Sequence, residues 1–146
     1  MRGLGLAMPV VVALLVLTLA GCGGATPQPH VTASLGIYSG RADPSWDFTD
    51  AEASLVVRAI SSLPVRVGEP PMGGLGYHGF SLVITRAGLA NETVVVFQGT
   101  IAAPGGGPRE YRVDDGRTVE RLVLDAGRAR LTPDEIAAVT ADMATP

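Results

Sequence analysis

The sequence has no lysine, a single cysteine (Cys22) and only two histidines among its 146 residues. One cysteine excludes a disulfide within the chain. Two histidines and no second cysteine give none of the ligand spacings of a structural zinc site. The motif G-x-S-x-G, which presents the nucleophilic serine of α/β-hydrolases, is also missing. We therefore expect no metal and no cofactor.

Basic residues are few, and all of them are arginine. Eleven arginines face fourteen Asp and Glu residues, so the formal net charge is -3 at pH 7. Proteins that bind nucleic acid neutralise its phosphates with a basic surface. The acidic balance therefore argues against nucleic acid as a partner, and against electrostatic docking on anionic lipid.

The one long apolar run lies at the N-terminus. Arg2 gives a positive start, an apolar run spans 4–19, and the small residues Ala20 and Gly21 precede Cys22. This order is typical of a secretory signal peptide. A run of about sixteen residues is shorter than the roughly 20 that a membrane-spanning helix needs. An uncleaved anchor and ordinary cleaved secretion remain as alternatives.

The segment Leu19-Ala20-Gly21-Cys22 resembles the lipobox of bacterial lipoproteins. The resemblance implies that residues 1–21 are a signal peptide and that Cys22, after cleavage, carries diacylglycerol and usually a further acyl chain such as palmitate. Two or more chains make such an attachment stable. It also implies a place on the cell membrane or outer membrane, facing away from the cytoplasm. Residues 22–30 are expected to be a flexible Gly/Pro tether.

Residues 31–146 have the length of one domain, and their first half predicts a strand and a helix. Apolar and polar residues alternate over 31–38, which is typical of a half-buried strand. The segment 39–48 contains Gly and Pro and predicts a loop. Thr49-Asp50-Ala51-Glu52 matches a capping box, so a helix is expected from there to Pro64.

A predicted hairpin occupies the middle of the domain. Residues 65–79 are rich in Pro and Gly and are expected to be irregular. Two β-rich runs, 80–86 and 93–98, predict an antiparallel hairpin. A loop is expected at 100–108, followed by a short strand at 111–113.

The C-terminal part predicts two helices. Asp114 or Asp115 is expected to cap a helix that ends at Gly127, a better account of the acidic pair than a calcium loop. The second capping box, Thr132-Pro133-Asp134-Glu135, opens a helix that reaches about Met143. The expected fold is α+β: a small antiparallel sheet packed on one face by about three helices.

A glycine motif precedes the predicted hairpin. Gly74-Leu75-Gly76-Tyr77-His78-Gly79 matches G-x-G-x-x-G, but that motif binds a dinucleotide only between a strand and a helix. Here Pro70-Pro71 precede it and a strand is expected to follow, so the segment is interpreted as a flexible approach to the hairpin. His78 is a candidate general base. A single His without a predictable partner is more often a loop or edge residue.

The only tryptophan lies in the loop 39–48. Because Trp and Arg are over-represented at binding hot spots, Arg41, Asp43 and Trp46, together with His78, are candidate binding residues. We favour a structural alternative, in which Trp46 folds back as a lid on the sheet and Arg41 pairs with Asp43 or Asp47.

The same loop carries a second resemblance. Residues 38–46 (YSGRADPSW), together with 76–80 and 115–122, resemble small bacterial proteins with a YSGR-x-DP-x-W stretch. The resemblance spans most of the mature chain and implies a shared domain, but it implies no chemistry.

These patterns predict a membrane-anchored lipoprotein whose domain is a non-enzymatic binding module for a protein or another component of the cell envelope. The alternatives are a small envelope enzyme that uses His78, and an inhibitor of an envelope enzyme that acts through a loop such as 39–48. A concave pocket with a carboxylate near His78 favours the enzyme. A flat surface with an exposed Trp46 favours binding.

Overall fold

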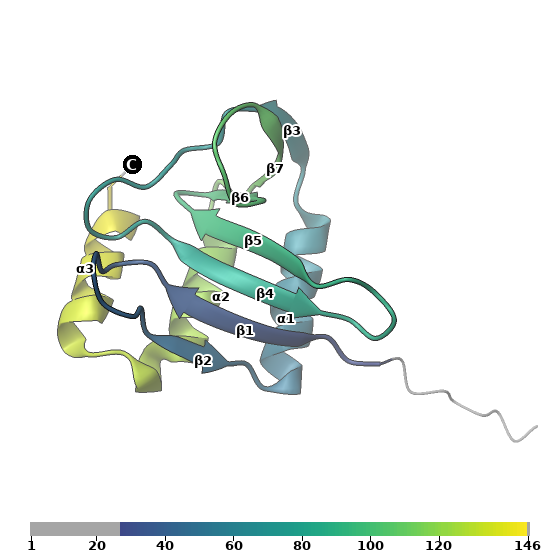
Figure 1. Cartoon of the computed structure of the whole chain (residues 1–146), viewed down its shortest axis with the longest axis horizontal. Coiled ribbons are helices and arrows are strands. Elements are labelled where there is room, and N and C mark those ends of the chain that lie inside the picture. The colour runs from purple at the N-terminus through teal and green to yellow at the C-terminus, as the bar shows by residue number, and fades with distance from the viewer. Residues whose placement is uncertain (1–26, 146) are drawn as a thin grey trace, which may run out of the picture.

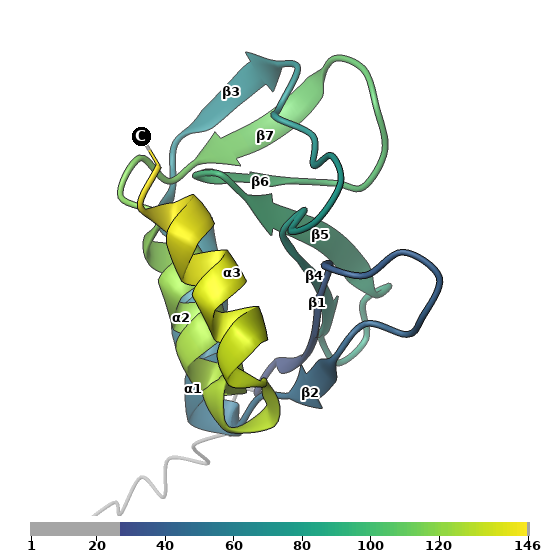
Figure 2. The same cartoon turned by 90° about the vertical axis from the view of Figure 1, so that its left-hand side faces the viewer.

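The computed structural model describes residues 27–145, which contain one sheet and three α-helices. The predicted signal peptide and Cys22 lie outside the described residues. The sheet is antiparallel throughout, with the strand order β2-β1-β4-β5-β6-β7-β3 (Figure 1). The helices pack on one face of it (Figure 2), so the expected α+β class is confirmed.

The order of strands and helices along the chain shows no internal repeat. In order they are β1 (His30–Leu35), β2 (Ser45–Asp47), α1 (Asp50–Ser62), β3 (Val65–Gly68), β4 (Phe80–Thr85), β5 (Glu92–Phe97), β6 (Thr100–Ala102), β7 (Arg109–Val113), α2 (Thr118–Gly127) and α3 (Pro133–Met143). A short 3-10 turn, Arg128–Arg130, joins α2 to α3. Among the helices in this part of the chain, none is both long and apolar enough to cross a membrane.

The predicted hairpin is the centre of the sheet. Strands β4 and β5 pair with Phe80 opposite Val96 and Leu82 opposite Val94. These four side chains face the helices and are buried. Burial of each large apolar side chain contributes about 1.5–3 kcal/mol. The alternation that predicted the hairpin is therefore the alternation that builds the core.

Both predicted capping boxes are present. The Thr49 hydroxyl accepts from the Glu52 amide, and the Glu52 carboxylate accepts from the Thr49 amide at 2.8 Å. Thr132 and Glu135 repeat the arrangement at the start of α3, with Pro133 in the first turn. Each box satisfies amides that the first helical turn leaves unpaired.

Three short strands were expected to be loop or irregular segments. Ser45–Asp47 is β2, Val65–Gly68 is β3 and Thr100–Ala102 is β6. Strand β6 forms because a two-residue turn joins it to β5. Gln98 and Gly99 both have positive φ, +45° and +70°, as a type I′ hairpin turn requires.

The ends of α2 differ from the prediction. Gly127 is not a left-handed cap: it is helical, and the chain continues into the 3-10 turn. At the other end the cap residue is Arg117, with φ +49°. The Asp114 carboxylate nevertheless accepts from the Val119 amide at 2.7 Å, so one of the two predicted acidic residues does bond to the helix start.

Candidate functional site

A groove crosses the face of the sheet that the helices leave uncovered. Its floor is formed by residues of β5 and β6 that alternate with the core residues, namely Val95, Phe97, Thr100 and Ala102. Its walls are the loops β3–β4 and β6–β7, which lie on this side of the sheet (Figure 2). The groove encloses about 340 Å³, within the range of small-ligand pockets.

The walls of the groove are largely apolar. Pro70, Pro71 and Met72 line one side, and Pro104 with Gly105 lines the other. Arg109 holds the second wall in place, since its guanidinium donates to the carbonyls of Ala103 at 2.8 Å and Gly107 at 3.0 Å. The arginine therefore shapes the loop, and the lining available to a ligand is mainly Pro, Met, Val and Phe.

His78 is one of the residues that line this groove. Its Nδ1 is 2.8 Å from the Gly76 carbonyl oxygen, a position that favours the proton on Nδ1. The ring packs against Gly36, where a Cβ would come within 2.6 Å of Nε2. Within residues 27–145 no Asp or Glu pairs with the ring.

The surroundings of His78 and Trp46 therefore fully match neither the enzyme hypothesis nor the hypothesis of a flat binding surface with an exposed Trp46. The pocket beside His78 is concave, but it offers the imidazole no carboxylate. Trp46 is only 5% exposed, so it is no surface anchor. The glycine motif leads into strand β4 and not into a helix, so the context that a dinucleotide site needs is missing there.

The other predicted binding residues lie apart from the groove. Trp46 belongs to β2 and packs edge-on against Phe80, with ring centroids 6.0 Å apart. It is thus buried as expected, although within a strand and not as the lid of a loop. Arg41 does not pair with Asp43 or Asp47: its guanidinium stacks on the Tyr38 ring at 3.3 Å. Asp43 instead accepts from the amides of residues 37 and 38.

A buried ionic cluster, absent from the sequence-based prediction, joins α2, α3 and the loop before β4. Glu120 is 0% exposed and accepts twice from Arg117, at 2.8 and 3.1 Å. It also accepts from the Tyr77 hydroxyl. Arg117 bonds in addition to the Asp142 carboxylate and, at 2.7 Å, to the Asp142 carbonyl. The i,i+3 spacing of Arg117 and Glu120 was the only sequence signal for this cluster.

Each ionisable side chain of the ionic cluster is engaged in hydrogen bonds to the others. Burial, the negative charge of Glu120 and the hydrogen bond to it raise the pKa of Tyr77 above its ordinary value. Burial disfavours the charge on Arg117, but the bonds to Glu120 and Asp142 outweigh it and raise the pKa of the guanidinium. Tyr77 and Arg117 therefore keep their protons at neutral pH. Such a cluster stabilises the fold and offers no free base.

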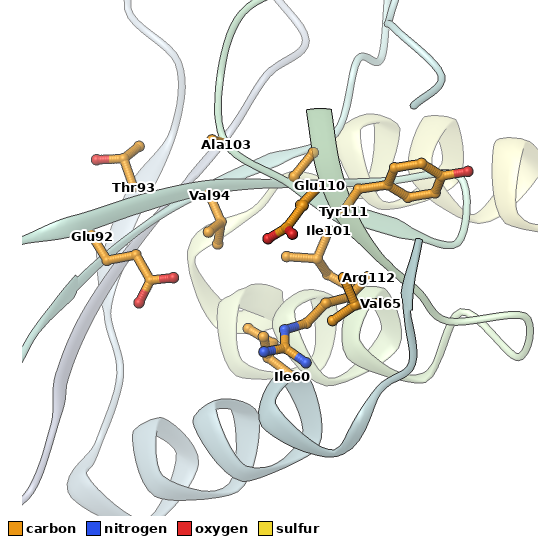
Figure 3. A pocket seen from close by; sticks show the side chains of 11 residues that line it. Ile60, Val65, Glu92, Thr93, Val94, Ile101, Ala103, Glu110, Tyr111 and Arg112 are labelled. Atoms are coloured by element: carbon orange, nitrogen blue, oxygen red, sulfur yellow. The ribbon is translucent and has the colours of Figure 1, made fainter. Parts of the chain in front are cut away.

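A second cavity, of about 250 Å³, lies on the helical side of the sheet, beyond the end of α1 (Figure 3). Ile60, Val65, Val94 and Ile101 form the apolar part of its lining, and Glu92, Glu110 and Arg112 add charged groups. Arg112 extends toward α1, where it donates to the Leu63 carbonyl at 2.9 Å. Arg112 thereby satisfies a carbonyl that the helix leaves unpaired.

Comparison with protein-family models, with curated proteins and with solved structures finds no match to this chain. Of the four candidate binding residues, His78 is the one that lines the groove. The floor residues and the proline walls were missed because they come from three separate segments of the chain.

Proposed function

We propose that this protein is a bacterial lipoprotein, anchored through Cys22, whose domain is a non-enzymatic binding module at the cell envelope. The observation that carries the binding role is the groove between the β3–β4 and β6–β7 loops. It has an apolar floor, proline walls and no carboxylate beside its histidine. Such a lining favours capture of an apolar group over acid–base chemistry.

The position of the groove supports this role. Strand β4 begins at Phe80 and ends at Thr85, which pairs with His30 at the start of the domain. The β3–β4 loop precedes Phe80, so the wall that it forms lies at the end of the sheet opposite the entry of the tether. Under this proposal, the groove lies at the end of the domain away from the point where the tether joins it.

A photolabelling experiment tests the groove. The full chain, processed and held in lipid nanodiscs, is irradiated with a small phenyldiazirine probe, and the labelled peptides are mapped by mass spectrometry. We expect labels on 69–79 and on 95–109. Val95→Phe should reduce this labelling about tenfold, because Val95 lies between Ser81 and Ala102 and a phenyl ring there fills the floor.

The matched control is Val83→Phe. Val83 points to the same face from β4 but does not line the groove. It should leave the labelling unchanged. Met72→Asp, in an exposed wall position, gives a second test that does not touch the sheet. Equal labelling of the wild-type, Val95→Phe and Met72→Asp chains would show that the groove is not the binding site.

A further inference from the structure

The sheet has an open edge at β3. This strand pairs with β7 on one side and, among residues 27–145, with no strand on the other. Its residues Val65 and Val67 are 52% and 76% exposed. Unpaired edge strands are templates for the addition of another strand, and proteins commonly protect them with charges or by keeping them very short. Both edge strands are short, since β3 has four residues and β2 has three, and each carries an exposed charge, Arg66 in β3 and Asp47 in β2.

The backbone of β3 is arranged for such an addition. The Val113 amide donates to the Pro64 carbonyl at 3.0 Å, which makes 64 and 113 a hydrogen-bonded pair. Hydrogen-bonded pairs alternate along an antiparallel ladder. Arg66 and Gly68 therefore bond to β7, and the N–H and C=O groups of Val65 and Val67 point to the open side.

The two faces of β3 differ in chemistry. Val65 and Val67 lie on the helical side, opposite Arg112 and Glu110 of β7, and Val65 lines the cavity beyond α1 (Figure 3). Arg66 lies on the other side, opposite Tyr111, and forms no ion pair within the part of the chain that the structure describes. Arg109, opposite Gly68, adds a second cation to that side.

This charge pattern decides which partner fits. A second copy that used the groups of both valines in antiparallel pairing would place Arg66 directly opposite its own copy, and like charges so placed are destabilising. A segment with an acidic residue at that position would pair opposite charges. Apolar residues on either side of it would pack on Val65 and Val67.

We propose that β3 is a docking strand: it binds an extended, apolar–acidic–apolar segment of a partner protein as an eighth, antiparallel strand of the sheet. Main-chain hydrogen bonds supply the affinity and the alternate side chains the specificity, as in other strand-addition complexes. Pro64 on one side and Pro70-Pro71 on the other limit the pairing to a short segment. This docking strand is separate from the groove, so either proposal can fail alone.

The test uses the full processed chain in nanodiscs and the dye-labelled peptide acetyl-Thr-Val-Asp-Val-Thr-amide, with fluorescence anisotropy as the readout. We expect saturable binding of this peptide. Arg66→Glu should weaken it at least about fivefold and should strengthen binding of the matched peptide with Lys in place of Asp. Exchange of the charge preference shows that the peptide lies beside Arg66.

Two variants of Val67 test whether main-chain hydrogen bonds hold the peptide. Val67→Pro removes an outward-pointing N–H and should abolish binding, whereas Val67→Thr keeps the N–H and the β-branch and should retain it. Two results would overturn the proposal. One is that the Asp peptide binds equally well to the wild-type, Arg66→Glu and Val67→Pro chains, or that it binds to none of them. The other is a wild-type dimer that Val67→Pro dissociates, which would make a second copy the occupant.

Discussion

The indole of Trp46 lies directly against Gly127, so that a Cβ at position 127 would come within 2.5 Å of the ring atom Cε2. Trp46 belongs to the edge strand β2, and Gly127 is the last residue of α2. The contact joins the helical layer to the sheet at a point where no larger residue fits.

Gly127→Ala should therefore destabilise the protein. Alanine favours a helix over glycine by about 1 kcal/mol, but the added methyl overlaps a buried ring, and overpacking costs about 1–3 kcal/mol. We expect a lower free energy of unfolding, measured by chemical denaturation. Gly74→Ala is the control, since a Cβ there meets nothing within 4 Å. Equal stability of the two variants would contradict the contact.

Trp46 is the only tryptophan, so its fluorescence reports on this contact alone. We expect blue-shifted emission that iodide quenches poorly, because the ring is 5% exposed. Trp46→Ala should cost about 3–5 kcal/mol. Trp46→Phe should cost less, since it also removes a buried indole N–H that has no hydrogen-bond partner within residues 27–145. Emission like that of free indole, with full quenching, would show that the ring is exposed.

Because Glu120 is the buried carboxylate of the ionic cluster, we expect its replacement to lower the free energy of unfolding strongly. Glu120→Ala leaves the Arg117 charge without its main buried partner, and the loss of one member of such a pair costs about 3–5 kcal/mol. The control is Glu69→Ala, at an exposed loop position. It should change the free energy of unfolding by less than about 0.5 kcal/mol. If the two variants are equally stable, Glu120 does not hold the helices together.

The contact between Tyr38 and Glu135 predicts a pH dependence. The Tyr38 hydroxyl donates to Glu135 at 2.5 Å and, with the Thr132 amide, lowers the pKa of that carboxyl. Because this pKa is lower in the folded protein than in the unfolded chain, the contact adds stability at pH values above the unfolded-state pKa of about 4.3. That added stability is lost as the pH falls through the folded-state pKa. Tyr38→Phe should therefore melt at a lower temperature than wild type at pH 6, and the difference should shrink below about pH 4. A difference that stays constant from pH 6 to pH 3 would contradict this coupling.

The elements that the sequence predicted correctly carry their own local signal. The capping boxes at Thr49 and Thr132 and the alternation of β4 and β5 can be recognised without knowing what lies across from them. Strands β2, β3 and β6 have three or four residues each and exist because of the strands beside them. The turn that makes β6 possible, Gln98-Gly99, is not the Asn-Gly or Asp-Gly sequence most typical of that geometry.

The site was less predictable than the fold, for a related reason. The predicted candidate His78 does line the groove, whereas the Pro/Gly-rich segments that form its walls were expected only as irregular or loop segments. That 69–79 and 103–108 cover the same face of the sheet follows from the strand order, which no local pattern predicts. Glu120 is likewise a surface residue by type, and its burial depends on Arg117, Tyr77 and Asp142 meeting around it.

We propose that this domain works at a membrane through a lipid on Cys22, and the intact mass of the mature protein shows whether that lipid is present. We expect a chain that begins at Cys22 and carries the added mass of a diacylglyceryl group, with or without a further acyl chain. Cys22→Ser should abolish both the added mass and the membrane attachment. An unmodified mature chain that begins at any other residue would contradict the account.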